Sequence, residues 1–287
     1  MKKKLIYLFS LATVCLLIFY LSSIFFATAF LSSNHLRIGD PPENFQAEKV
    51  SFKTGDGLTL KGWYSKVSDS SKVIILLHGY KANRLEMIPK AELFKELGYD
   101  VLLYDARGCG ESEGDMVSLG YYEKEDLIAA VNFLNGMGKN DIAVYGFSQG
   151  GATAILASED LTGVRCIISE VTFDNLENAI DNRFRKYLFI PGYLGTFFMR
   201  EEAEKKLGIS IDEIQPIDKI KNIKVPIFII GGEDDSRTVL KNTMDLFNAA
   251  NEPKELWISP DSEHENIYEK NPLMFESKIK EFLKKYL

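Results

Sequence analysis

The chain has 287 residues, 46% of them hydrophobic, which is enough to bury a sizeable core in one large domain or two small ones. The formal net charge is -7, and the three lysines at positions 2–4 are the only charged residues before position 35, so the body is more acidic still. An acidic body argues against nucleic-acid binding. Three cysteines are too few for a disulfide framework and lack the paired spacing of a zinc site, so we expect no metal.

The N-terminal segment is strongly apolar, with no charged residue from Leu5 through Asn34. A secretory signal has an apolar region of about 7–15 residues, whereas a membrane-spanning helix needs about 20. The run fits a span, and the lysines before it place the N-terminus in the cytoplasm and the body outside. We therefore expect residues 1–34 to be a single-pass anchor in the cell membrane. A cleaved signal is the alternative, because Ala27-Thr28-Ala29 resembles an A-x-A cleavage site.

Residues 35–46 contain Pro41-Pro42 and show no periodicity, which predicts a linker. Beyond it, residues 49–54 and 58–64 flank Gly55-Asp56-Gly57 and predict a β-hairpin. Apolar runs then predict strands at 73–77, 100–105, 141–147, 164–169, 225–232 and 254–259. Helical patterns predict helices at 85–98, 123–136, 148–158, about 239–250, and 272–286.

This alternation of strands and helices predicts an α/β fold with a mostly parallel central sheet flanked by helices. One insert, at about 171–216, breaks the alternation between two core strands. It is rich in large apolar residues, namely Phe173, Phe184, Tyr187, Leu188, Phe189, Tyr193, Phe197 and Phe198. We expect a small helical cap over the carboxyl edge of the sheet, where such folds bind ligands. A helical hairpin that merely packs is the alternative.

The segment Gly146-Phe147-Ser148-Gln149-Gly150 lies between a predicted strand and a predicted helix. Gly-x-Ser-x-Gly in that context is typical of a sharp turn that presents a nucleophilic serine. The turn needs small neighbours, and Gly146, Gly150 and Gly151 meet this need. The serine then begins a helix, where backbone N–H groups favour developing negative charge. A tight turn without chemistry is the alternative interpretation.

A serine hydroxyl needs a base. The chain has three histidines: His35 lies beside the predicted span, His78 ends a buried strand, and His264 lies between the last strand and the last helix. Only His264 occupies the place of a base in the order Ser, acid, His. Taken alone, it would read as an exposed loop histidine, but with the serine turn present we predict that it is the base.

The base needs a carboxylate to fix its tautomer, and Glu233, Asp234 and Asp235 follow the penultimate strand. The usual spacing places this acid three residues after a loop glycine. Counting from Gly232 gives Asp235, which we favour because the next helix then begins near Val239. Asp234, counted from the preceding glycine, remains an alternative.

Two N–H groups are needed to hold the oxyanion that forms during acyl transfer. One is expected from Gln149, directly after the nucleophile, and the other from the backbone of Tyr80, in the loop after the strand at 73–77. His78, in the same loop, is expected to be a structural hydrogen-bonding residue.

The chain from about Val50 to Leu287 resembles the α/β-hydrolase superfamily. The segments that carry the resemblance are LLHGY, YDARGCGESEG, VYGFSQGGA, IIGGEDD and SEH, in the order that the superfamily shows. Within it, the chain looks most like membrane-anchored bacterial hydrolases related to Bem46-like proteins and to serine aminopeptidase-like (S33-type) hydrolases. The resemblance implies a catalytic domain at residues 47–287, the Ser148, Asp235 and His264 triad, an oxyanion hole at Tyr80 and Gln149, and no metal or organic cofactor.

One departure is Cys109, at a position where relatives often carry an aromatic residue or histidine and which borders their pocket. Cys109 as the nucleophile is a less favoured alternative, because no serine-type turn or second base serves it. Nearby, Asp105 and Arg107 are expected to hold their loop by an internal ion pair.

We therefore predict a membrane-tethered serine hydrolase that cleaves an ester or related acyl bond of a small molecule. Peptide or amide hydrolysis is an alternative, in which Glu170 or Asp174 would bind a free amine. A binding protein on a retained hydrolase fold is a third possibility. Arg183, Arg185 and Lys186 are expected to form a solvated basic face, with recognition of a substrate carboxylate as the alternative.

Overall fold

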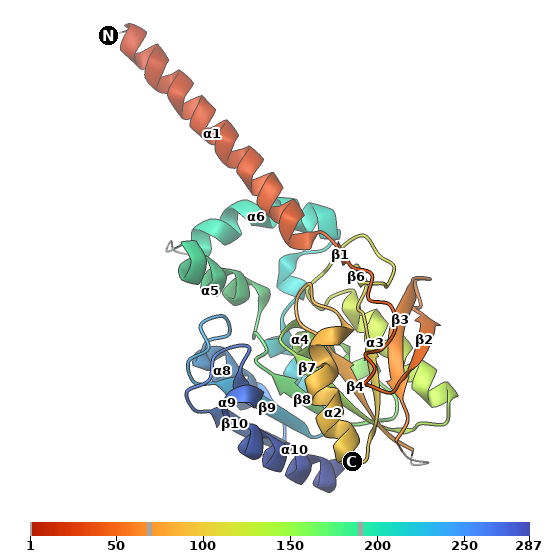
Figure 1. The fold of residues 1–287 in the computed structure, drawn as a ribbon. Helices are drawn as coiled ribbons and strands as arrows, with labels where there is room; N and C mark the ends of the chain where they lie inside the picture. Colours follow the sequence, from red (N-terminus) through yellow and green to blue (C-terminus); the bar gives the residue numbers. More distant parts are fainter. Residues whose placement is uncertain (1, 68–70, 189–191) are drawn as a thin grey trace.

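A computed structural model describes residues 2–67, 71–188 and 192–287 (Figure 1). Its centre is an eight-stranded sheet with the order β10-β9-β8-β7-β4-β5-β3-β2. The strands are β2 (Glu48–Lys53), β3 (Thr59–Ser65), β4 (Lys72–Leu77), β5 (Asp100–Tyr104), β7 (Asp141–Phe147), β8 (Val164–Glu170), β9 (Ile227–Gly232) and β10 (Lys254–Ser259). The strand β3 runs antiparallel to β2 and β5, whereas the remaining neighbours pair in parallel.

Helices cover both faces of this sheet. They are α2 (Ile88–Glu96), α3 (Glu123–Gly136), α4 (Gln149–Ala157), α8 (Leu240–Ala249), α9 (Ile267–Lys270) and α10 (Pro272–Tyr286). Successive strand residues point to opposite faces, so Val73 and Ile75 pack in one core cluster and Ile74 and Leu76 in the other. The first cluster includes side chains of α3, α4 and α8, and the second those of α2 and α10. The predicted mostly parallel sheet flanked by helices is confirmed.

The helix expected at 85–98 differs slightly from the prediction. It begins as a 3₁₀ turn at Arg84–Met87, and the α-helical part starts one residue before Pro89. Proline suits the first turn of a helix because its missing N–H has no intrahelical partner there. The helix ends before Gly98, whose φ of +89° places it in the left-handed region that closes many helices.

The insert at about 171–216 forms α5 (Leu176–Leu188) and α6 (Gly192–Leu207), followed by a 3₁₀ turn at Ile211–Glu213 and the short helix α7 (Pro216–Lys219). In Figure 1, α5 and α6 lie above the strands, on the side where the N-terminal helix meets the body. Of the large apolar residues expected here, Phe189 lies outside the described residues, as do the side chains of Leu188, Tyr193, Phe197 and Phe198. Phe173 is buried and Phe184 packs against the same small core cluster.

The N-terminal helix α1 (Lys2–Leu31) extends away from the body (Figure 1). Within it, Ile6–Leu31 is long and apolar enough to cross a membrane. Most large side chains up to Phe26 are exposed, but Ala27 and Leu31 are buried where the last turns reach the body. These last turns pack beside α6.

The segment at residues 35–46 is more tightly bound to the body than the predicted linker. The two-residue strand β1 (Asn34–His35) pairs in parallel with β6 (Cys109–Gly110). The Leu36 N–H then donates to the Gly110 carbonyl, and Phe45 is buried in the main core. The prolines that suggest a linker lie between these two attachments, which depend on partners distant in sequence.

Candidate active site

Ser148 lies at a sharp turn between the end of β7 and the start of α4. Its φ of +53° and ψ of -109° are strained for a residue with a side chain. A Cβ at Gly146 would overlap the Gly150 backbone, and one at Gly150 would overlap the Leu77 carbonyl. The Ser148 N–H donates to the Glu170 carbonyl at 2.8 Å, which ties the turn to β8. Gly146 and Gly150 are therefore required because the backbone approaches them too closely for a side chain.

His264 and Asp235 complete a hydrogen-bonded chain with Ser148. The Ser148 Oγ lies 3.0 Å from His264 Nε2, and His264 Nδ1 lies 2.7 Å from Asp235 Oδ2. All three side chains are buried. A proton on Nδ1 faces the carboxylate, which leaves Nε2 free to accept the serine proton. The three residues come from separate loops at the carboxyl ends of β7, β9 and β10.

Asp235, and not Asp234, is the acid that reaches His264. Glu233 and Asp234 are exposed, whereas Asp235 is buried. Its carboxylate accepts the backbone N–H groups of Arg237 at 2.7 Å and Thr238 at 3.0 Å, as well as the Thr238 hydroxyl at 2.5 Å. Burial alone would raise the pKa of Asp235, but the hydrogen bonds and charge from His264 and Thr238 outweigh burial and lower it.

Both residues expected to supply oxyanion donors are close to Ser148, one next to it in sequence and one in the lining of its cavity. Gln149 is the first residue of α4, so its N–H has no acceptor within the helix. Tyr80 follows β4 and lines the same cavity as Ser148. The Gly79 N–H donates to Glu86 at 2.6 Å, which braces this loop. An oxyanion hole at Tyr80 and Gln149 stays a prediction.

His78 joins two loops, in agreement with its expected structural role. Its Nε2 accepts the Ala106 N–H at 3.0 Å, so the proton lies on Nδ1, which donates to the Gly79 carbonyl at 2.8 Å. The ring is buried and its two nitrogens are thereby occupied. His78 thus supports the loop that precedes Tyr80.

Cys109 does not border the catalytic pocket, unlike the residue at this position in the relatives. Cys109 is fully buried and does not line the Ser148 cavity, and burial raises the pKa of its thiol to about 12. A thiol with so high a pKa is a poor nucleophile.

The predicted ion pair between Asp105 and Arg107 is wrong. Asp105 pairs with Arg84, and Arg107 pairs with Asp126 at 2.7 Å, because these partners reach the loop from other elements.

The two acids considered for amine recognition are engaged inside the protein. Glu170 is buried with its carboxylate 3.9 Å from Lys90 Nζ, and burial raises its pKa to about 7 although the Lys90 charge opposes the shift. Asp174 is buried and accepts hydrogen bonds from Asn178 and Asn242, at 2.8 Å and 2.9 Å. Neither lines the Ser148 cavity.

The Ser148 cavity has a volume of about 340 Å³ and reaches from the sheet edge to the cap. Its lining residues are Phe30, Gly79, Tyr80, Glu86, Phe147, Ser148, Arg183, Tyr187, Arg237, His264 and Glu265. Arg183 and Tyr187 come from α5, so this helix lies over the serine. Arg185 instead forms an exposed pair with Asp181.

Sequence reasoning missed Phe30, Glu86, Arg237 and Glu265 as lining residues. Glu265 directly follows His264, and Arg237 lies two residues after Asp235, so proximity to a recognised motif was a usable signal for these two. Phe30 lies 118 positions before Ser148 in the numbering, and only the fold brings the two together. Arg237 pairs with Glu265 and donates to the Tyr187 hydroxyl at 3.0 Å, which joins the cap to the histidine loop.

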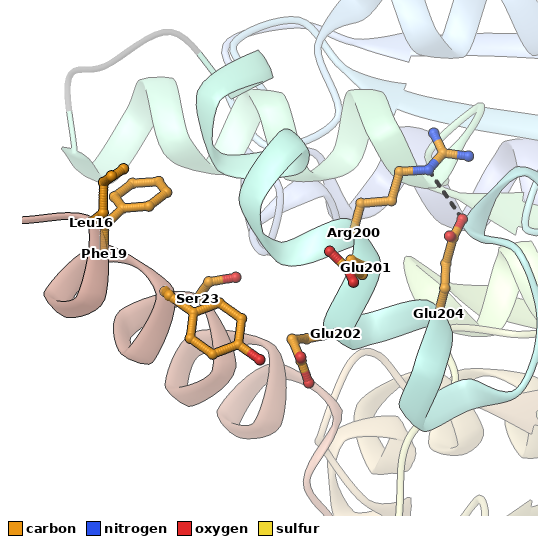
Figure 2. Close-up of a pocket in the computed structure, with 8 residues that line it drawn as sticks. Leu16, Phe19, Ser23, Arg200, Glu201, Glu202 and Glu204 are labelled. Atoms are coloured by element: carbon orange, nitrogen blue, oxygen red, sulfur yellow. Dashed lines mark hydrogen bonds and ion pairs between the residues drawn. The ribbon is translucent and has the colours of Figure 1, made fainter. Parts of the chain in front are cut away.

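A second cavity, of about 510 Å³, lies between α1 and α6 (Figure 2). Leu16, Phe19, Tyr20 and Ser23 line it from α1, and Arg200, Glu201, Glu202 and Glu204 from α6. It contains no histidine that could activate a nucleophile, so it does not compete with the Ser148 cavity as a catalytic site. Among the described residues, no group of three or more His, Cys, Asp or Glu side chains is placed to hold a metal ion.

Comparisons with known proteins agree with this architecture. A family model described as alpha/beta hydrolase fold matches residues 72–215, a range that includes Ser148 and ends before Asp235. The chain is 29% identical over 248 residues to the uncharacterized protein YqkD of Bacillus subtilis (strain 168), covering 83% of this chain and 80% of YqkD. It is 28% identical over 225 residues to protein bem46 of Schizosaccharomyces pombe (strain 972 / ATCC 24843), covering 75% and 70%.

Among solved structures, the esterase Pf2001 of Pyrococcus furiosus superposes with a TM-score of 0.74 at 26% identity, covering 89% of this chain and 98% of the esterase. The similarity therefore extends over most of this chain and nearly all of the esterase.

Proposed function

The chain belongs to the α/β-hydrolase family, and on that premise we propose that it is a serine hydrolase that cleaves an ester or related acyl bond. The observation that carries the proposal is the continuous hydrogen-bonded chain from Ser148 through His264 to Asp235. The esterase identity of the Pyrococcus furiosus neighbour adds support for the reaction class.

The proposed reaction has two halves. In the first, the Ser148 hydroxyl attacks the substrate carbonyl as His264 Nε2 accepts its proton, and Asp235 stabilises the imidazolium. The Tyr80 and Gln149 N–H groups hold the tetrahedral oxyanion. When the intermediate collapses, the leaving alcohol takes the proton from His264 and an acyl-Ser148 ester remains. In the second half, His264 deprotonates a water, which attacks the acyl group and releases the acid.

The surroundings of Ser148 favour an ester over a peptide with a free amine. Two acids line the cavity, and both are engaged. The Glu86 carboxylate accepts the Gly79 N–H at 2.6 Å, and Glu265 pairs with Arg237. Peptide or amide hydrolysis on the same residues is the second candidate. A matched ester and amide of the same acyl group separate the two, since faster turnover of the amide would contradict the ester proposal.

We also propose that residues 1–34 remain attached as a membrane anchor, with residues 47–287 as the catalytic domain outside the cytoplasm. Contacts at the end of α1 support retention. The Tyr80 hydroxyl donates to the Phe30 carbonyl at 2.5 Å, and Lys81 Nζ donates to the Ala29 carbonyl at 2.5 Å. Cleavage after Ala29 would remove part of this attachment. Retention of residues 1–34 is tested by measuring the mass of the protein recovered from washed membranes. A mass that corresponds to a mature N-terminus at Phe30 would contradict the anchor.

The experiment that tests the catalytic proposal is hydrolysis of a short ester, 4-methylumbelliferyl butyrate, by the full chain in detergent. We expect turnover by the wild type and none above background by the Ser148→Ala variant. Turnover that survives this substitution would place the chemistry elsewhere in the chain.

A further inference from the structure

An apolar cavity of about 250 Å³ lies beside the Ser148 cavity. Its walls come from three helices. Phe26, Ala29 and Phe30 belong to α1, Ile180, Arg183, Phe184 and Tyr187 to α5, and Met199 to α6. Apart from Arg183 and the Tyr187 hydroxyl, these side chains offer only hydrocarbon surface. Such a cavity suits an alkyl chain better than a polar group, because an apolar lining leaves polar atoms without hydrogen-bond partners.

The apolar cavity is continuous in its walls with the catalytic one. Phe30, Arg183 and Tyr187 line both. An acyl group whose carbonyl lies at Ser148 would have to pass these three side chains to reach the apolar cavity. This arrangement matches a substrate with a polar ester at one end and a hydrocarbon chain at the other.

The last turn of α1 is a fixed part of this wall. The Phe30 and Tyr80 rings lie 5.2 Å apart between centroids, and the Tyr80 hydroxyl donates to the Phe30 carbonyl. Lys81 Nζ donates to the Ala29 carbonyl and, at 2.7 Å, to the Ser32 hydroxyl. Tyr80 and Lys81 belong to the loop proposed to supply an oxyanion donor, so α1 is attached to the catalytic machinery.

If α1 is a membrane anchor, as proposed above, its position places the apolar cavity near one face of the membrane. The helix carries no charge from Leu5 to its end at Leu31. Its stretch from Leu5 to Ser22 alone is roughly 27 Å long at 1.5 Å per residue, close to the thickness of a hydrocarbon core. Figure 2 shows Glu201 and Glu202 on the side of α6 that faces α1 near Ser23, whereas Arg200 and Glu204 point away from α1. A membrane boundary near Ser23 would bring the cavity residue Phe26, about one turn further along α1, beside the membrane surface.

We propose that the end of α1 forms one wall of an acyl-binding pocket, and that the substrate is a long-chain acyl ester taken from the adjacent membrane leaflet. This inference rests on the proposed serine hydrolase function. The helix then has two roles: it holds the enzyme at the membrane, and it completes the pocket for the chain. The hydrocarbon chain leaves the bilayer for the apolar cavity without crossing bulk water, which lowers the activation barrier for the transfer.

The test uses the full chain in phosphatidylcholine liposomes, with 4-methylumbelliferyl palmitate and butyrate as substrates. Ala29→Phe fills the cavity from the α1 side. Thr28→Phe is the matched control, since Thr28 is exposed on the same turn and does not line the cavity. We expect Ala29→Phe to lower the ratio of kcat/KM for palmitate to that for butyrate by about tenfold or more. Thr28→Phe is expected to leave this ratio unchanged.

An unchanged ratio in Ala29→Phe would overturn the inference, provided that a small fluorophosphonate still labels Ser148 in that variant. If labelling shows that Ala29→Phe is not folded, Phe184→Trp fills the same cavity from α5, and the same two outcomes apply. In a second arm, the palmitate ester is placed either in the liposomes that carry the enzyme or in separate liposomes without enzyme. Equal rates of palmitate turnover in the two cases would overturn uptake from the adjacent leaflet. Absence of both labelling and butyrate turnover in the wild type would instead contradict the serine hydrolase proposal.

Discussion

The serine turn and the substrate wall are built in different ways. Ser148 is held by its immediate neighbours, because Gly146 and Gly150 allow the backbone to fold back on itself. The wall of the apolar cavity is assembled from α1 and from the pair α5 and α6, which follow α1 by more than a hundred residues of chain. The chemistry therefore depends on a short local pattern, whereas the shape of the pocket depends on long-range packing.

This contrast explains what could be predicted. The strands and helices of the sheet follow from apolar periodicity, which is local, and their ends agree with the structure to within a few residues. The three residues that meet at Ser148 were found because parallel strands bring their carboxyl ends to one edge, so loop order translates into proximity. Register pairs such as Leu77 with Gly146 and Phe147 with Glu170 show this alignment.

The errors lie where partners are distant in sequence. The Asp105 and Arg107 pair was expected because the residues are near neighbours, but Arg84 and Asp126 reach them from other elements. Residues 35–46 were expected to be a linker because of Pro41-Pro42 and the absence of periodicity, and their contacts with β6 and the main core have no local signature. Phe30 was assigned only to the anchor for the same reason.

The largest expected effect concerns the local region. Ser148→Ala removes the nucleophile, so we expect kcat/KM for 4-methylumbelliferyl butyrate to fall by at least about 10⁴-fold. The matched control is Ser158→Ala, at the other end of α4 and away from the cavity. A similar loss in both variants, measured by steady-state hydrolysis, would show that damage to α4 and not loss of the nucleophile explains the result.

The next largest effect is expected at the carboxylate that contacts His264, and it distinguishes Asp235 from its neighbour Asp234. Asp235→Asn keeps the shape but removes the charge that stabilises the imidazolium, so we expect kcat/KM to fall by about 10³–10⁴-fold. Asp234→Asn changes an exposed carboxylate one residue away and is expected to have little effect. The opposite order of the two losses would identify Asp234 as the functional acid.

Glu170 links the serine turn to pH-dependent stability. Burial raises its pKa to about 7 from an ordinary 4.5. Between these values the unfolded chain releases the proton while the folded protein keeps it, so the free energy of unfolding falls as pH rises and levels off above about 7. The contribution is at most about 3 kcal/mol.

The measurement is urea unfolding of the full chain in detergent at pH 5, 6, 7 and 8, for the wild type and Glu170→Gln. We expect the wild type to lose more stability over this range than the variant, which has no proton to release at this position. Asp126, whose pKa burial also raises to about 7, remains in both proteins, so its contribution cancels. Parallel curves would contradict the account of Glu170.

The smallest expected effect concerns the contact between the two regions. Tyr80→Phe removes the hydrogen bond to the Phe30 carbonyl while keeping the ring. A single hydrogen bond of this kind contributes about 1 kcal/mol, so we expect kcat/KM for the palmitate ester to fall by about threefold to tenfold, with Ser148 still labelled. A larger loss for butyrate than for palmitate would show that Tyr80 serves the chemistry and not the substrate wall.

The most direct test of the central claim is labelling of the full chain by a fluorophosphonate, which reacts with activated serines. The account predicts that the wild type is labelled, that Ser148→Ala is not, and that His264→Ala loses labelling although Ser148 is present. His78→Ala, if folded, should retain labelling, because His78 joins loops and does not contact Ser148. A folded wild type that resists labelling, or a His264→Ala variant labelled as fast as the wild type, would contradict the claim that His264 activates Ser148.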